Sequence, residues 1–105
     1  MLDAINAWEI VAEGVQRRIR VDGEKLMVVE VQFQPGAVGV LHQHVHEQAT
    51  YIASGRVTFT VGDEKHELAQ GQMILVPSNV VHGCVAHEAT TLLDSFSPPR
   101  EDFRK

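Results

Sequence analysis

Three histidines in two separate stretches have the residue type and spacing of a metal site. His42 and His44 lie two residues apart, and His82 ends a second apolar stretch forty residues later. Val38 and Val40 share the parity of the first two histidines, and alternate residues of a strand point to one face. This alternation predicts that the histidines project into an apolar interior. Imidazole there is costly unless something binds it, and neutral imidazole suits zinc, copper, iron and nickel.

Gln48 follows His44 by four residues and could add an amide oxygen as a fourth ligand. Its alternative role is to form hydrogen bonds in the lining of the interior. Three neutral imidazoles and a neutral amide leave the charge of a divalent ion uncompensated, which favours anionic ligands such as a carboxylate. The set also leaves coordination positions open, as in catalytic sites. We expect one divalent ion, either zinc, nickel, manganese or iron.

Three nearby residues remain open as further ligands. His46 has the parity of the earlier histidines, but we expect the chain to turn at Glu47 and His46 to line the mouth of the site. Glu47 is the alternative anionic ligand. Cys84 shares the parity of His82 and either faces the cavity or fills space as a small buried residue. The sequence does not decide whether any of the three reaches the metal.

Composition excludes several classes of protein. The chain of 105 residues has a net charge of -5 and no basic run, which argues against nucleic acid as a partner. No apolar run reaches membrane-spanning length, and the N-terminus lacks the basic start and apolar core of a signal peptide. Cys84 is the single cysteine, so no internal disulfide can form. Together these features predict a cytoplasmic protein that does not bind membranes.

Apolar and polar residues alternate over many short stretches that are separated by turn residues. This pattern predicts an all-β fold in one domain spanning residues 1–105, and a two-sheet jelly roll limits its exposed edges. We expect a lead-in segment or edge strand over about residues 1–13 and a tail over residues 98–105, which the prolines exclude from a central strand. The expected strands are residues 15–21, 26–33, 50–53, 57–61, 66–68, 73–76, 80–86 and 90–96.

The spacing of glycines and histidines resembles the two motifs of the cupin superfamily. They read Gly36-x5-His42-x-His44-x3-Gln48-x6-Gly55 and Gly71-x5-Pro77-x-Asn79-x2-His82. The resemblance implies a cupin-type double-stranded β-helix, a small jelly-roll barrel with the metal inside. Gln48 departs from the glutamate of many cupins, and Asn79 stands where a glycine is common.

A stretch near the C-terminus makes the resemblance more specific. Residues 93–103 read Leu-Asp-Ser-Phe-Ser-Pro-Pro-Arg-Glu-Asp-Phe and place Asp94 and Phe96 on one strand face. An aspartate in an apolar strand needs a partner or a task. With residues 76–83, this stretch is similar to the KdgF family of pectin-degradation cupins, over about residues 8–103. Glutamine in the first motif is expected in that family, so Gln48 is no longer a departure.

The family resemblance implies a substrate and a reaction. Such proteins convert 4,5-unsaturated uronates to linear 5-keto-4-deoxyuronate by ring opening and tautomerisation, with no cofactor beyond the metal. The resemblance makes Asp94, Phe96 and Arg100 the catalytic positions. Asp94 would move the proton, Phe96 would pack against the sugar ring, and Arg100 would bind the substrate carboxylate through its guanidinium fork. Their alternative roles are an ion-paired aspartate, a core phenylalanine and a surface arginine.

Two other functions stay open at this point. One is a different metal-cupin enzyme, such as a dioxygenase or a decarboxylase of a small acid. The other is a sugar-binding cupin without enzymatic activity. Cupins commonly pair through their sheets, so the resemblance also implies a homodimer, with an interface that the sequence does not reveal.

Overall fold

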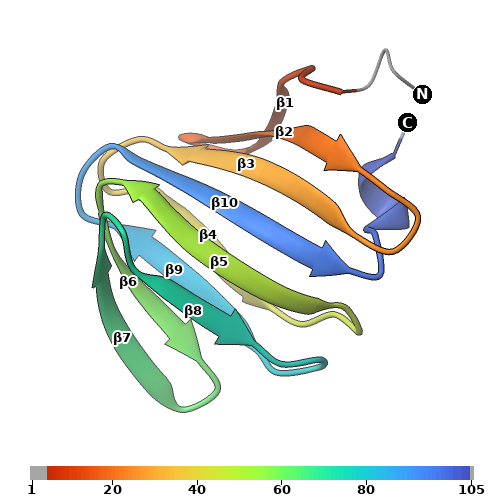
Figure 1. Cartoon of the computed structure of the whole chain (residues 1–105). Coiled ribbons are helices and arrows are strands. Elements are labelled where there is room, and N and C mark those ends of the chain that lie inside the picture. The colour runs from red at the N-terminus through yellow and green to blue at the C-terminus, as the bar shows by residue number, and fades with distance from the viewer. Residues whose placement is uncertain (1–4, 105) are drawn as a thin grey trace.

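The computed structural model describes residues 5–104, which form two antiparallel β-sheets that face each other (Figure 1). The larger sheet has six strands, in the order β1 (Glu9–Ala12), β2 (Val15–Asp22), β3 (Met27–Phe33), β10 (Thr90–Ser97), β5 (Glu47–Ser54) and β8 (Met73–Val76). The smaller sheet has four, in the order β4 (Val38–His42), β9 (His82–Ala86), β6 (Arg56–Val61) and β7 (Glu64–Ala69). The predicted all-β jelly-roll fold is confirmed.

The apolar core lies between the two sheets and follows the alternation of the strands. Phe33, Ile52 and Leu92 of the larger sheet are buried against Val57 and Phe59 of the smaller one. A second buried cluster lies toward the C-terminal end of β10 and comprises Ile19, Met27, Val29, Phe96 and Phe103. The core is therefore apolar at both ends, and polar groups enter it from β5, β9 and β10.

The inward face of β4 differs from the expectation. Val38 and Val40 are 47% and 69% exposed, so they do not form an apolar interior face. Gly39 faces the interior, because a Cβ built on it would lie 3.1 Å from Sγ of Cys84. The pairing of β4 with β9 shifts between Gly39 and His42, and this β-bulge reverses the parity of the strand. The prediction that valines and histidines share one face was wrong for this reason.

Both ends of the described chain lie along the larger sheet. The lead-in segment includes an edge strand, β1, which pairs with β2. After β10 the chain forms a short 3₁₀ helix, Glu101–Phe103, and the ring of Phe103 packs edge-on against that of Phe96. Residues 1–4 and 105, at the ends of the predicted lead-in segment and tail, lie outside the described residues. Within residues 5–104 no helix has the length and apolar character to cross a membrane.

Candidate functional site

Three histidines from the smaller sheet and the loop beside it come together between the sheets. His42 ends β4, His44 follows it in a loop, and His82 begins β9. One ring nitrogen of each lies within 4.8 Å of the other two. His82 is buried, His44 is half-buried and His42 is exposed, so the cluster extends from the interior to the surface. An ion held there would be accessible from solution.

Gly83 permits the close approach that brings two of these histidines together. A Cβ on Gly83 would lie 2.6 Å from the carbonyl oxygen of Gly39, closer than real Cβ contacts allow. The bulged register then pairs His42 directly with His82, and their ring centroids lie 4.3 Å apart. The glycine beside His82 therefore sets the spacing of the strands that carry the cluster.

Backbone carbonyl groups orient all three imidazole rings. In each ring Nδ1 lies 2.8–2.9 Å from the carbonyl oxygen of a residue two positions away. A carbonyl oxygen only accepts, so Nδ1 carries the proton in each neutral ring and Nε2 keeps its lone pair. Carbonyl contacts of this kind are typical of histidines that bind metal. The pairs are His42 with Val40, His44 with His46, and His82 with Val80.

The histidine cluster fits a cation. Nε2 of His82 is buried and has no hydrogen-bond partner among the described residues. Burial lowers the pKa of His82 to about 4, and burial together with the charge of Arg100 lowers the pKa of His44. Both rings are therefore neutral at neutral pH, which is the form that binds metal ions. Because a buried lone pair without a donor is costly, a divalent transition metal suits this site.

The side chain of Gln48 reaches the same cluster from β5 of the larger sheet. Its Oε1 lies 3.0 Å from Nε2 of His44, while its Nε2 donates to Oγ1 of Thr50 over 2.9 Å. With Nδ1 of His44 protonated, the amide oxygen and the ring nitrogen are two acceptors that face each other. A cation shared between them would remove this conflict, which supports Gln48 as a fourth ligand.

Asp94 lies on β10 directly opposite Thr50 of β5, and it is buried. Its Oδ1 accepts a hydrogen bond of 2.7 Å from the Thr50 hydroxyl. Burial raises the pKa of Asp94 to about 6, although the hydrogen bond from Thr50, the charge of Arg100 and Gln48 oppose the rise. Near neutral pH both forms of this carboxyl group are accessible, as a general acid or base requires.

Arg100 is held over two aromatic rings at one end of the site. Its guanidinium carbon lies 5.1 Å from the ring centroid of Phe96 and 4.2 Å from that of Phe103. Its Nε and Nη2 donate to the carboxylate of Asp102 over 3.0 and 2.8 Å, and this pair lowers the pKa of Asp102. The Arg100 side chain is only 11% exposed. This low exposure speaks against the alternative of a surface arginine on the tail.

A cavity of about 330 Å³ joins these groups. Its size is near the lower end for small-molecule sites, which suits one sugar ring. Of the seven predicted site residues, all but His44 line it, and His44 contacts the rings of Phe96 and His82. The lining residues predicted from the sequence are His42, Gln48, His82, Asp94, Phe96 and Arg100.

The three residues left open by the sequence do not join the cluster of ring nitrogens. Within the described chain, only the three named histidines form a group of potential metal ligands among His, Cys, Asp and Glu. His46 has a buried Nδ1 without a described hydrogen-bond partner, and Glu47 is exposed. Cys84 lines the cavity, and burial raises its pKa to about 12, so the thiol stays protonated.

Two residues near the site did not emerge from the sequence. Thr50 is fully buried between Gln48 and Asp94. It has the parity of Gln48 on one strand, a signal that could have placed it on the same face. Asp102 lines the cavity and binds Arg100, but no pattern in the tail distinguishes it from its neighbour Glu101.

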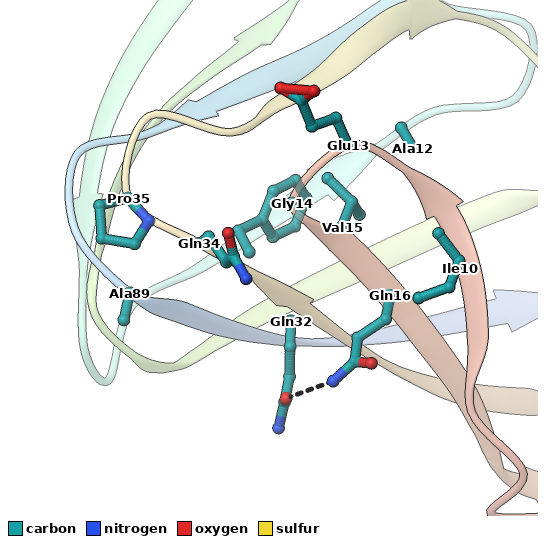
Figure 2. A pocket seen from close by; sticks show the side chains of 11 residues that line it. Ile10, Ala12, Glu13, Gly14, Val15, Gln16, Gln32, Gln34, Pro35 and Ala89 are labelled. Carbon is teal, nitrogen blue, oxygen red and sulfur yellow. Dashed lines mark hydrogen bonds between the residues drawn. The ribbon is translucent and has the colours of Figure 1, made fainter.

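A second hollow, of about 460 Å³, lies between the turn that joins β1 to β2 and the turn after β3. Figure 2 shows the side chains that line it, among them Gln16 and Gln32, whose amides bond to each other over 3.1 Å. Glu13 is the single ionisable residue in its described lining, which contains no histidine or cysteine. This hollow therefore lacks the groups for metal or nucleophilic chemistry.

Comparison with known proteins agrees with the fold. A cupin domain model matches residues 29–96. The pectin degradation protein KdgF of Dickeya dadantii is 36% identical over 97% of this chain and 94% of its own. The solved structure of KdgF from a Halomonas species is 38% identical, with a TM-score of 0.90 over 94% of this chain and 92% of that one. An RmlC-like cupin from Shewanella frigidimarina is 35% identical, with a TM-score of 0.89 over 93% and 88% of the two chains. The chain therefore belongs to the cupin family and is a homologue of KdgF.

Proposed function

We propose that this protein is a metal-dependent enzyme that converts 4,5-unsaturated uronates to linear 5-keto-4-deoxyuronate. The observation that carries the proposal is a buried carboxyl group, Asp94, in one cavity with an arginine and two members of a three-histidine cluster. Homology to KdgF, whose name assigns it to pectin degradation, supports the same substrate class.

The reaction needs one proton to move and no oxidant. The anomeric hydroxyl loses its proton, the bond between C1 and the ring oxygen breaks as the C1 aldehyde forms, and the enolate left at C5 takes a proton at C4 to become a ketone. Substrate and product are isomers, so a single carboxyl group can accept the first proton and return one to carbon. Asp94, with a pKa of about 6, suits both directions of transfer.

The cavity also suits an anionic sugar. A divalent metal held by His42, His44, Gln48 and His82 would supply a Lewis acid that stabilises negative charge on substrate oxygens. The proposed ligands are all neutral, so they leave the charge of the ion available to an anion. Arg100 would bind the substrate carboxylate, and its packing on Phe96 limits the freedom that it would lose on binding.

The test is turnover of a purified unsaturated monouronate, followed by loss of the absorbance of its double bond, with and without a chelator. The unsaturated sugar also opens spontaneously, so the rate above the protein-free background is the quantity to compare. A rate that falls to background with chelator and returns with added metal supports the proposal. Equal rates with and without protein would refute it, and oxygen consumption would point to a dioxygenase instead.

We also propose that the protein is a cytoplasmic homodimer. Exposed apolar side chains on β8, namely Met73 and Leu75, give the larger sheet a surface that a second copy could cover. The single unpaired cysteine is in keeping with a reducing compartment. Analytical ultracentrifugation checks the first part and cell fractionation the second.

A further inference from the structure

A chain of hydrogen bonds runs from Asp94 through Thr50 to Gln48 and ends at the histidine cluster. Asp94 accepts from Oγ1 of Thr50 over 2.7 Å, and Oγ1 accepts from Nε2 of Gln48 over 2.9 Å. Oε1 of Gln48 then lies 3.0 Å from Nε2 of His44. Strands β5 and β10 are neighbours throughout this region, so the chain crosses from one strand to the next (Figure 1).

The single proton of the Thr50 hydroxyl gives this chain a direction. An ionised Asp94 can only accept, so the hydroxyl proton must point to it. The lone pairs of Oγ1 then remain for Gln48, which must present its NH₂ group to them. The amide oxygen is thereby directed the other way, toward His44. The two ends of a glutamine amide are nearly equal in shape, and this hydroxyl distinguishes them.

We infer that Thr50 is a positioning residue that fixes the amide of Gln48 with its oxygen toward the metal. The inference rests on the proposed metal site and adds a residue to it that touches neither metal nor substrate. Because outer contacts of this kind orient the ligands of a metal, their loss typically lowers metal affinity about 10–100-fold.

The alternative role of Thr50 is to fill space. Its side chain is completely buried and lies opposite Ile74 of β8 in the strand pairing. Valine has nearly the same shape and would preserve this packing while removing the hydroxyl. Substitution by valine therefore separates the two roles, since only a positioning residue requires the hydroxyl group.

The test is the affinity of the metal-free protein for Co²⁺, measured by titration for the wild type, Thr50→Val and Thr50→Ser. We expect valine to lower the affinity at least tenfold and serine to stay within about threefold of the wild type. The visible absorption of bound Co²⁺, which depends on its ligands, should change with valine and be restored with serine. Should the valine variant not fold, Thr50→Ala removes the same hydroxyl and carries the same expectation.

Thr90 supplies a matched control on the neighbouring strand. It is also a buried threonine, but its hydroxyl donates to the backbone oxygens of Glu88 and Arg56, away from the cavity. Thr90→Val removes a buried hydroxyl without touching the site. Its Co²⁺ affinity and spectrum should match those of the wild type, whatever its effect on thermal stability.

A double-variant cycle tests whether Thr50 acts through Gln48. In the Gln48→Ala background there is no amide to orient, so adding Thr50→Val should change Co²⁺ affinity by less than about threefold. Additive losses would show that Thr50 acts by another route and would overturn the inference. Wild-type affinity and spectrum in both Thr50→Val and Thr50→Ala would also overturn it.

These measurements are independent of the substrate. If the wild type fails to convert unsaturated uronates but Thr50→Val still weakens Co²⁺ binding, the proposed reaction fails and the inference stands. If the wild type converts the uronate and Thr50→Val binds Co²⁺ normally, the reaction stands and the inference fails.

Discussion

Asp94 and His82 lie in one cavity, and burial moves their pKa values in opposite directions. It raises that of Asp94 to about 6 and lowers that of His82 to about 4. The cause is the same, because removal from water disfavours the charged form of each group. The histidine therefore stays neutral, in the form that a metal ligand requires, while the carboxyl group can take up and release a proton near neutral pH.

Replacing Asp94 by asparagine removes this exchange of protons with little change in shape. We expect kcat to fall about 10²–10⁴-fold, since this is the typical contribution of a positioned acid or base. KM and metal content should change little. Steady-state kinetics with elemental analysis provide the check, and Asp63→Asn, in an exposed turn, is the control. Near-normal turnover by folded, metal-loaded Asp94→Asn would remove Asp94 from the mechanism.

In the proposed reaction Arg100 binds the substrate and does not transfer a proton. Its Nε and Nη2 already donate to Asp102, which holds the guanidinium plane in place and leaves Nη1 for a substrate carboxylate. Arg100→Lys keeps the charge but loses the planar group that Asp102 holds in place and with it the positioned Nη1 donor, so KM should rise about tenfold, as expected for a lost charge-assisted hydrogen bond of roughly 1.5 kcal/mol. The value of kcat should change little.

Arg104→Lys is the matched control for this change. It lies in the same tail, but its guanidinium binds Asp22 outside the cavity. Its KM should equal that of the wild type. An unchanged KM in both Arg100→Lys and Arg100→Ala would reduce Arg100 to packing and would weaken the uronate proposal.

At the scale of strands, the fold could be predicted from the sequence because a β-fold depends on the alternation of residues and on turns. The sequence also predicted that the histidines and Gln48 lie together, because the spacing of the motifs carries that information. The parity of β4 was misjudged because a bulge between Gly39 and His42 depends on pairing with β9. Thr50 was missed because its partner Asp94 lies 44 residues away, and a single sequence does not state which strands pair.

Gly83 shows how a strand contact supports the site. In Gly83→Ala the new methyl group would meet the backbone oxygen of Gly39, so β4 must move away from β9. Because β4 carries His42, we expect metal affinity to fall at least tenfold. Val85→Ala, at an exposed position of β9, should leave the affinity unchanged. Wild-type affinity in a folded Gly83→Ala protein would contradict this account.

The outer face of β2 and β3 contains a buried carboxylate that makes stability depend on pH. Glu30 is 6% exposed and accepts hydrogen bonds from Arg18, Arg20 and Gln32. Burial alone would raise its pKa, but these three contacts together lower the pKa below its ordinary value. A carboxyl group with a lowered pKa stabilises the fold above its unfolded pKa, and this contribution is lost as the pH falls through the folded value.

Glu30→Gln should therefore be less stable than the wild type at pH 7, by on the order of 2 kcal/mol. The difference should shrink as the pH falls below about 4.3, the pKa of an unperturbed glutamate. Urea unfolding at pH 7 and pH 3 measures both, and Glu24→Gln, at an exposed position, is the control. A difference that grows at pH 3 would contradict the assigned direction.

For the whole molecule, the proposed metal decides the charge of the cavity. The chain carries a net charge of -5, and the cavity lining sets Arg17 and Arg100 against Asp94 and Asp102, with the histidine cluster between the sheets. A bound divalent ion would therefore give the cavity a net positive charge. With the ion in place a small anion would be attracted within the cavity, although the protein as a whole does not favour polyanions.

The proposed metal would also join the two sheets, which predicts that it stabilises the fold. His42 and His82 come from the smaller sheet and Gln48 from the larger one, so the complete ligand set exists only in the folded chain. We expect elemental analysis to find close to one divalent ion per chain. Free metal a hundredfold above its Kd should add about 2.7 kcal/mol, which raises the Tm of a domain of this size by roughly ten degrees or more. Scanning calorimetry with and without chelator measures the shift.

His66→Ala, on β7 outside the cavity, should keep both the bound metal and the shift in Tm, whereas the double variant of His42→Ala and His82→Ala should lose both. If the double variant still holds one equivalent, the ion lies elsewhere and the two sheets are held together by packing alone.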